Sequence, residues 1–347
     1  MNNQSQHTII IRCDGSHRIG LGHVVRCLTL AQKLTAKYTF KVYFAVRFDT
    51  LAIEMIAAKG YEIISPNTEI DFDYENWLLE SLLLVNSKTL ILDSRDGLTF
   101  ENVQNIKRQG VYVASIDDIE DKRRACDAVF YPPIPQAKTF DWNSFTGNIY
   151  WGWEYVILRD QFIQKLVKLE NKTLRLLVSM GGTDPKNLTG KIVKIIVESN
   201  LDYFVDVLIG NGYKQKDELL SLCKNNKTIT IFQNYSNVAE IMGKADIAII
   251  SFGVTAYEIA ALGVPAIYVC LFSEQMDSAS TFVNGGFAIN LGEYQNVSDR
   301  DILESLKEVI QKPEKWMIMR EKLSHLAIKD GAKNIANIIF NKTINTL

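Results

Sequence analysis

The chain has 347 residues, of which 47% are hydrophobic and 22% are charged, and its formal net charge at pH 7 is −2. This length is sufficient for two domains of ordinary size, each with its own hydrophobic core. The near-neutral balance and the lack of any dense tract of Lys or Arg argue against a nucleic-acid-binding surface. We therefore expect a soluble globular protein.

In the first half of the chain, short β-branched runs alternate with segments of helical periodicity. This alternation is typical of βαβ units and a mostly parallel sheet. Strands are predicted at 8–13, 41–46, 61–64, 89–93, 111–116 and 127–130. Helices are predicted at 22–37, 49–59, 74–85 and 99–108.

Residues 131–172 separate the two halves and contain Pro132, Pro133 and Pro135, which prevent continuous secondary structure. The alternation then resumes. Strands are predicted at 174–179, 204–209, 228–231, 246–250, 266–270 and 287–290. Helices are predicted at 186–198, 214–224, 236–243, 254–262, 275–284, 299–311, 313–325 and 331–345.

The doubled pattern predicts an α/β protein of two Rossmann-like domains, with parallel sheets facing a cleft. We place an N-terminal domain at 1–155, a hinge at 156–172 and a C-terminal domain at 173–328. The remaining segment, 329–347, is available to pack back on the first domain as a helix.

One long apolar segment, 245–272, could be mistaken for a membrane span. A membrane helix here would have to bury the carboxylates of Asp246 and Glu258, and Pro265 interrupts it. The segment instead predicts a strand, a loop, a helix, a turn and a second strand. No integral membrane segment is expected.

The cysteines and the N-terminus indicate a reducing compartment. The five cysteines are an odd number without a C-x-x-C pair, which argues against structural zinc and a disulfide scaffold. Cys13, Cys27 and Cys270 fall on apolar positions, where we expect buried thiols. The polar start MNNQSQHT lacks the basic and apolar regions of a secretion signal, so a cytoplasmic protein is expected.

The most informative motif is RCDGSHRIGLGHVVRC at 12–27, between the first predicted strand and the first predicted helix. Glycines at this turn, Gly20 and Gly22 among them, would bring backbone N–H groups close to an anion at the positive end of the helix. His17 and His23 are two of only four histidines in the chain. The motif predicts a phosphate-bearing substrate beside a titratable base.

Two alternatives accompany this interpretation. The glycines could only close a tight connection, and His23 could only cap the helix. The polar side chains of Asp14 and Arg26 favour a ligand site, because open α/β sheets bind ligands at the carboxyl ends of their strands.

Two further glycine turns follow predicted strands in the second half. At 176–189, the turn holds Gly181, Gly182 and Thr183, with Asp184 as a predicted N-cap and Pro185 at the first helical position. A ligand-binding turn and a merely well-capped loop both fit this pattern.

The second turn follows a strand that ends at Ser251. Gly253, Val254 and Thr255 open a helix whose backbone N–H groups suit a diphosphate. Glu258 lies one turn further along and could accept both hydroxyls of a ribose. A solvent-facing Glu on an amphipathic helix is the alternative.

The chain resembles the UDP-2,4-diacetamido-2,4,6-trideoxy-sugar hydrolase family of pseudaminic acid biosynthesis. That family is similar to the UDP-GlcNAc-using glycosyltransferases of peptidoglycan synthesis, which have the two-domain GT-B architecture. The resemblance rests on RCDGSHRIGLGHVVRCLTLAQKL (12–34), VASIDDIEDKRRACDAVFY (113–131), GWEYVILRDQF (152–162), SMGGTDPKNLT (179–189), GVTAYEIAALGVP (253–265) and KDGAKNI (329–335).

The resemblance implies that His23 matches the essential histidine of the family. It implies a nucleotide site at Gly181-Gly182, at Phe232-Gln233-Asn234 beside the uracil, at Gly253-Val254-Thr255 beside the diphosphate, and at Glu258 beside the ribose. It implies no metal and no cofactor.

Three positions depart from the family pattern. Asp93-Ser94-Arg95 replaces an Asp-His-Tyr triplet, Glu274-Gln275 stands for an Asn-Gln pair, and Tyr131-Pro132-Pro133 replaces Asn-rich sequence. We keep Gln275 as a candidate substrate-binding residue. These departures leave the particular sugar open.

The resemblance and the motifs together predict a UDP-sugar hydrolase of nonulosonic acid biosynthesis. A neutral His23 would activate water, while Asp14 would orient the histidine or hold a sugar hydroxyl. Attack at the anomeric carbon and attack at phosphorus both remain open, although the resemblance favours carbon. A GT-B glycosyltransferase with a UDP-sugar donor and a non-catalytic nucleotide-sugar-binding module are the alternatives, and the oligomeric state stays open.

Overall fold

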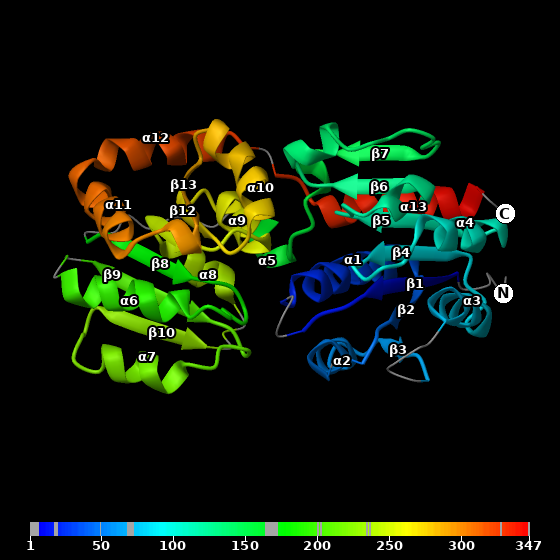
Figure 1. The fold of residues 1–347 in the computed structure, drawn as a ribbon, viewed down its shortest axis with the longest axis horizontal. Coiled ribbons are helices and arrows are strands. Elements are labelled where there is room, and N and C mark those ends of the chain that lie inside the picture. The colour runs from blue at the N-terminus through cyan, green and yellow to red at the C-terminus, as the bar shows by residue number, and fades with distance from the viewer. Residues whose placement is uncertain are drawn as a thin grey trace. The chain divides into compact units, whose positions relative to one another are not determined.

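The computed structural model describes residues 7–16, 20–48, 50–67, 73–163, 173–199, 201, 203–233, 235, 237–326 and 328–345. The chain divides into two compact units (Figure 1). Unit 1 comprises Met1–Ile157 and Lys329–Leu347, and unit 2 comprises Leu158–Ile328. Part of the predicted hinge, 164–172, lies outside the described residues.

Unit 1 is built on a seven-stranded parallel sheet in the order β3-β2-β1-β4-β5-β6-β7. Its strands are β1 (Thr8–Cys13), β2 (Lys41–Ala45), β3 (Glu62–Ile64), β4 (Thr89–Asp93), β5 (Tyr112–Ile116), β6 (Ala128–Tyr131) and β7 (Asn148–Trp151). Its helices are α1 (Gly22–Tyr38), α2 (Thr50–Ala57), α3 (Tyr74–Leu84), α4 (Phe100–Arg108) and α13 (Gly331–Asn345), with the 3-10 helices η1 (Asp121–Ala125), η2 (Pro135–Lys138) and η3 (Trp153–Tyr155).

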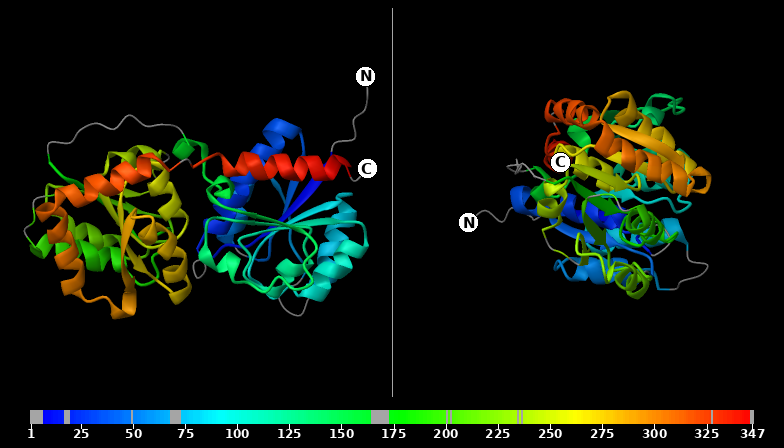
Figure 2. Two further views of the ribbon diagram at one scale, coloured as in Figure 1. Left: turned by 90° about the horizontal axis from the view of Figure 1, so that it is seen from above. Right: turned by 90° about the vertical axis from the view of Figure 1, so that its left-hand side faces the viewer.

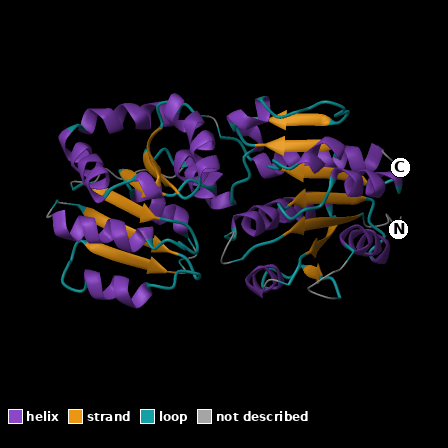
Figure 3. Ribbon diagram, in the orientation of Figure 1, coloured by secondary structure: helices purple, strands orange, loops and turns teal. Residues whose placement is uncertain are grey.

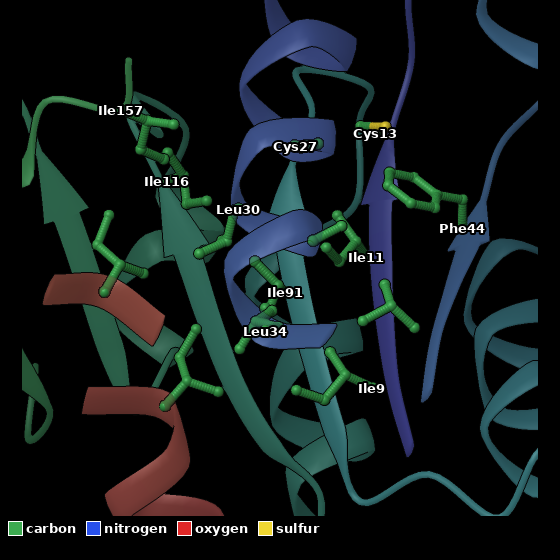
Figure 4. Packing of buried hydrophobic residues seen from close by; sticks show 14 of the residues in the cluster. Ile9, Ile11, Cys13, Cys27, Leu30, Leu34, Phe44, Ile91, Ile116 and Ile157 are labelled. Atoms are coloured by element: carbon green, nitrogen blue, oxygen red, sulfur yellow. The ribbon is translucent and has the colours of Figure 1, made fainter. Parts of the chain in front are cut away.

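The alternation of β1 distributes its isoleucines over both faces of this sheet. Ile9 and Ile11 pack with Leu30 and Leu34 of α1 in one buried cluster (Figure 4), whereas Ile10 belongs to the cluster under α3 and α4. The sheet is therefore buried on both faces, as a parallel sheet requires.

Helix α13 returns from the far end of the sequence to lie against α1 of unit 1 (red in Figure 2). The rings of Tyr38 and Phe340 stack with centroids 4.2 Å apart, and Lys33 Nζ lies 3.0 Å from Asp330 Oδ2. Burial of Ile335 and Ile339 makes α13 part of the core of unit 1.

Unit 2 contains a six-stranded parallel sheet in the order β10-β9-β8-β11-β12-β13 (strands are orange in Figure 3). Its strands are β8 (Arg175–Ser179), β9 (Phe204–Ile209), β10 (Ile229–Gln233), β11 (Ile247–Ile250), β12 (Ala266–Cys270) and β13 (Ala288–Glu293). Its helices are α5 (Asp160–Ile163), α6 (Leu188–Ser199), α7 (Lys216–Cys223), α8 (Val238–Lys244), α9 (Val254–Ala261), α10 (Ser273–Asn284), α11 (Asp299–Gln311) and α12 (Pro313–Ser324), with the 3-10 helix η4 (Tyr294–Asn296).

The structure confirms the α/β class, the parallel sheets and each of the predicted strands and helices, with shifts of a few residues at their ends. Segment 245–272 forms β11, α9 and β12, as predicted. Cys13, Cys27 and Cys270 are buried free thiols. Within the described residues, no helix combines the length and the apolar character needed to cross a membrane.

The sequence did not predict β7, α5 or the 3-10 helices. The prolines of 131–172 stand at positions 132, 133 and 135, before and at the start of η2, so they leave residues 148–151 free to pair with β6. A cluster of prolines interrupts only its own neighbourhood, and the remainder of such a segment can still add a strand to a sheet edge.

Candidate functional site

Each sheet has one position where the strand order reverses. In unit 1 it lies between β1 and β4, and in unit 2 it lies between β8 and β11. Open α/β sheets bind ligands beyond the carboxyl ends of the strands at such a switch point. Most of the predicted site residues follow three of these strands, β1, β8 and β11, so the topology brings them to two switch points, one in each unit.

His23 is the second residue of α1, and its ring contacts the last residue of β4. Its Nδ1 atom lies 2.6 Å from Oδ1 of Asp93, whose side chain is fully buried, while the imidazole is 22% exposed. Burial alone would raise the pKa of Asp93, but Arg26 and His23 outweigh burial and hold that pKa well below its ordinary value.

The ionised state of Asp93 fixes the tautomer of His23. A carboxylate only accepts hydrogen bonds, so the proton between Asp93 and His23 belongs to Nδ1 of the ring. The lone pair of Nε2 is then available to accept a proton. This arrangement suits a general base.

Arg26 lies one helical turn after His23 and binds two carboxylates. Its Nε and Nη2 atoms donate to Oδ2 and Oδ1 of Asp93, both at 2.5 Å. Its Nη1 atom donates to Asp117 Oδ2 at 2.9 Å. Two carboxylates thus hold the guanidinium in place. Contact of Arg26 with substrate stays a prediction.

The structure corrects the expectation that Asp14 orients His23. Arg12 donates to both oxygens of Asp14, at 2.6 and 2.5 Å, and Arg47 Nε donates to Oδ2 at 2.9 Å. Arg12 is fully buried in β1, and its guanidinium pairs with the carboxylates of both Asp14 and Asp96. Asp93 takes the orienting position instead, and a contact of Asp14 with a sugar hydroxyl stays a prediction.

The glycines of the first turn differ in their roles. Gly20 has φ +80°, which favours glycine, and its N–H donates to the carbonyl of Ser16 at 2.8 Å. Gly22 begins α1, and its N-cap residue, Leu21, makes no side-chain hydrogen bond to the first turn. His17 lies outside the described residues.

In unit 2, the loop after β8 is fixed by close backbone contacts. Gly181 has φ +88°, and the carbonyl of Gly182 accepts from Gly212 N at 3.2 Å. Thr183 is half-buried in the same loop. Helix α6 begins at Leu188, later than predicted.

This late start changes the roles predicted for Asp184 and Pro185. Asp184 is not the N-cap and Pro185 precedes the helix, yet the carboxylate of Asp184 accepts from Leu188 N and Thr189 N at 2.9 and 2.8 Å. Asp184 has a left-handed backbone conformation, with φ +36°. Asp184 therefore accepts hydrogen bonds from the first N–H groups of α6, although it lies outside the helix.

The turn after β11 lies beside the loop after β8. A Cβ at Gly181 would lie 3.7 Å from the hydroxyl oxygen of Ser251. Helix α9 starts at Val254, and its N-cap residue, Gly253, has no side chain to cap it, so the N–H groups of Val254 and Thr255 lie at the positive end of the helix.

Glu258 is buried with 4% exposure, so the alternative of a solvent-facing Glu is wrong. Burial raises its pKa, and the guanidinium of Arg159 partly offsets this shift. Arg159 Nη2 donates to Glu258 Oε1 at 2.7 Å. Sequence reasoning missed this pairing, as it missed the contact of Asp93 with His23.

Phe232 and Gln275 lie on either side of the switch point of unit 2. Phe232, near the end of β10, makes an edge-to-face contact with Tyr235 at a centroid distance of 5.7 Å. Gln275 of α10 follows β12, and its Oε1 accepts from Leu271 N at 2.7 Å, which leaves the amide N–H groups for a ligand. Asn234 lies outside the described residues.

Across the described ranges, no group of three or more His, Cys, Asp or Glu residues could hold a metal ion. The signal that could have identified Asp93 was its position: it ends a strand and is the first residue of the triplet that stands in place of the family's Asp-His-Tyr. The partner of that carboxylate depends on which strand lies next to β1, which the sequence does not display.

The comparisons with known proteins agree with this organisation. Residues 165–335 match the model of the glycosyltransferase family 28 C-terminal domain. The crystal structure of MurG from Acinetobacter baumannii superimposes with a TM-score of 0.71 at 15% identity, over 97% of this chain and 99% of that one. The chain has the GT-B fold.

Two sequence relatives extend the comparison beyond the fold. An uncharacterized protein of Methanocaldococcus jannaschii is 28% identical over 272 residues, or 75% of this chain, which spans only 54% of that relative. The UDP-2,4-diacetamido-2,4,6-trideoxy-β-L-altropyranose hydrolase of Campylobacter jejuni is 25% identical over 287 residues, or 81% of this chain and 98% of the hydrolase.

Proposed function

We propose that this GT-B protein is a UDP-sugar hydrolase of nonulosonic acid biosynthesis. It releases UDP and a free 2,4-diacetamido-2,4,6-trideoxyhexose or a related sugar, without a metal or cofactor. The similarity to the Campylobacter jejuni hydrolase, which extends over nearly the whole of that enzyme, supports this substrate class.

The observation that carries the proposal is the contact of His23 with Asp93. Nε2 of His23 takes a proton from water as the water oxygen bonds to the anomeric carbon. The bond from that carbon to the β-phosphate oxygen breaks, and its electron pair leaves with UDP. Asp93 stabilises the imidazolium that forms, and positioned bases of this kind contribute about 10²- to 10⁴-fold to rate.

Unit 2 holds the UDP in this proposal. Backbone N–H groups of Gly253, Val254 and Thr255, at the positive end of α9, bind the diphosphate, where they also stabilise the charge of the leaving group. Glu258 accepts from the ribose hydroxyls. The remaining predicted contacts are the loop at 181–183, Ser251, Phe232 beside the uracil and Gln275 at the sugar.

A GT-B glycosyltransferase that uses a UDP-sugar donor is the second candidate. The match of residues 165–335 to a glycosyltransferase domain favours it. Incubation of the purified protein with UDP-sugars and no acceptor separates the two functions. Equal amounts of free sugar and UDP indicate the hydrolase, whereas turnover only after an acceptor is added indicates the transferase.

The bond that breaks is identified by running the reaction in H₂¹⁸O. We expect the label in the free sugar, because water attacks carbon; label in UDP would show attack at phosphorus. The variant His23→Ala should lose turnover and still bind UDP. Full activity of that variant would contradict the role proposed for His23.

A further inference from the structure

A short segment at the start of unit 2, Leu158–Ile163, is fastened to the helix that carries Glu258. The side chains of Leu158 and Phe162 are both 1% exposed, and α5 packs against α9. Between these two apolar anchors, Arg159 is 36% exposed at its side chain. The anchors therefore fix the backbone from which Arg159 extends.

The guanidinium of Arg159 is held by an ion pair and by an aromatic ring. Nε and Nη2 donate to the same oxygen of Glu258, Oε1, at 3.2 and 2.7 Å. The carbon Cζ lies 4.9 Å from the ring centroid of Phe162, a cation–π contact. Arg159 thus reaches Glu258 from a fixed direction and occupies one of its two oxygens.

Gln161 fastens the same segment to a second helix. Its Oε1 accepts from Ala239 N at 3.2 Å, in the first turn of α8. Helix α8 follows the loop after β10, and α9 follows the turn after β11. Residues 158–163 therefore contact the first turn of one helix and the buried carboxylate of the next.

The carboxylate of Glu258 needs such a partner because burial penalises its charge. A neutral carboxyl group donates from one oxygen, whereas an ionised one accepts at both. Among the described residues, only Arg159 donates a hydrogen bond to the carboxylate of Glu258, and it does so at Oε1, which leaves Oε2 for a ligand. The carboxylate of Glu258, held in one orientation by Arg159, could accept hydrogen bonds from two hydroxyl groups on adjacent carbons, as in a ribose.

We infer that Arg159 is a positioning residue that fixes the carboxylate of Glu258 and thereby makes unit 2 select ribonucleotides over 2′-deoxyribonucleotides. The inference rests on the proposed function, which assigns the ribose of UDP to Glu258. Arg159 acts through Glu258 rather than on the nucleotide, so its removal should change the discrimination between sugars more than the binding of the diphosphate.

The test is isothermal titration calorimetry of the full chain with UDP and with 2′-deoxy-UDP. We expect the wild-type protein to prefer UDP by about 10- to 100-fold, since a buried acceptor loses its donor in the deoxy complex. Glu258→Gln and Arg159→Gln should each bring the ratio of the two affinities close to one. The double variant should lower it no further, because both changes disable one carboxylate.

The matched control is Arg175→Gln. Arg175 is 29% exposed at its side chain and binds buried Asp206 at 2.9 and 2.8 Å, but it stands at the first residue of β8, the opposite end of the sheet. This variant should keep the wild-type ratio. Arg159→Lys, which keeps the charge but loses the fork of donors, should give an intermediate ratio, and thermal unfolding checks that each variant is folded.

The outcomes separate the inference from the proposed function. If Glu258→Gln loses the preference and folded Arg159→Gln keeps it, the positioning role of Arg159 is overturned while the ribose site stands. An equal weakening of UDP and 2′-deoxy-UDP by Arg159→Gln also overturns that role. A wild-type protein that binds neither nucleotide contradicts the proposed function itself.

Discussion

Nδ1 of His23 and Oδ1 of Asp93 lie 2.6 Å apart at the point of the first sheet where the strand order reverses. The ring comes from the first turn of a helix and the carboxylate from the end of the adjacent strand, so two rigid elements set the distance. An imidazole held in this way presents Nδ1 to its carboxylate partner, and in the proposed mechanism Nε2 faces the water.

The first prediction concerns Asp93→Asn. The Asn amide can donate to Nδ1 of His23. This stabilises the tautomer of His23 that carries its proton on Nε2, and in that tautomer Nε2 cannot accept a proton from water. We expect kcat to fall by about 10²- to 10⁴-fold with the affinity for UDP unchanged. Steady-state kinetics and calorimetry measure the two quantities.

The control for this substitution is Asp127→Asn. Asp127 is paired with Lys107 at 2.9 Å beside the first residues of β5 and β6, away from the switch point, and its loss should leave kcat unchanged. Retention of full turnover by folded Asp93→Asn would show that the carboxylate has no part in the reaction.

The second prediction concerns Arg26→Gln. Without the guanidinium, burial is no longer offset, so the pKa of Asp93 rises. Protonation then sets in at a higher pH, and the acid limb of the kcat/KM profile should move upward. The lost partner of a buried charge should also lower the free energy of unfolding at pH 7 by about 3–5 kcal/mol.

The pH dependence of this loss has a defined sign. A depressed pKa in the folded state gives stability that is present above the pKa of the unfolded chain and is lost as pH falls. The wild-type protein and Arg26→Gln should therefore differ most near neutrality and converge in acid. Denaturant unfolding at several pH values checks this, and a difference that grew toward acid would contradict it.

The third prediction concerns Asp118, which follows Asp117 in the loop after β5. Burial raises its pKa to about 6, although Lys122 Nζ lies 3.6 Å from Oδ2, with the charges of Glu120 and Arg95 as smaller influences. The carboxyl group of Asp118 therefore holds its proton more tightly in the folded protein than in the unfolded chain. As a result, the free energy of unfolding falls as pH rises from about 4 to 6.

Asp118→Asn should remove that dependence. We expect the variant to be more stable than the wild-type protein above pH 6, by up to about 3 kcal/mol, and equally stable below pH 4. Thermal unfolding across this range measures the difference. A gain of the same size at pH 4 and pH 8 would show that the carboxylate does not titrate as stated.

The sequence was sufficient to predict the strands and helices and one member of each of two polar pairs, His23 with Asp93 and Glu258 with Arg159. The period of the apolar residues predicted the strands and helices, and the glycines near His23 and Thr255 predicted turns at the carboxyl ends of strands. The partners of His23 and Glu258 were harder to predict, because Asp93 lies 70 residues from His23 and Arg159 lies 99 residues from Glu258. Such pairs depend on strand order, which local patterns do not encode.

Proximity in sequence also misled. Asp14 is nearer to His23 along the chain than Asp93 is, which made it the natural candidate to orient the ring. The structure instead gives Asp14 to Arg12, a cation buried in a strand whose other residues are largely apolar. Arg12 also donates to Asp96 Oδ2 at 2.7 Å, so this buried guanidinium gathers two carboxylates, which offsets the cost of burying its charge.

The fourth prediction contrasts two glycines that touch in unit 2, Gly182 after β8 and Gly210 after β9. A Cβ at Gly210 would lie 2.3 Å from the carbonyl oxygen of Gly182, whereas a Cβ at Gly182 would have open space within 4 Å. Gly210→Ala must therefore push the loop at 181–183 away from its position, at a cost of about 1–3 kcal/mol in stability.

Because this loop belongs to the proposed UDP site, Gly210→Ala should weaken UDP binding about tenfold or more, while Gly182→Ala should unfold at the wild-type temperature. Calorimetry and thermal unfolding of Gly210→Ala and Gly182→Ala separate the effect of the steric clash from the effect of an added methyl group, because both variants add the same group. Equal affinities for UDP in the wild-type protein and Gly210→Ala, with a lowered melting temperature in Gly210→Ala, would place the nucleotide away from this loop.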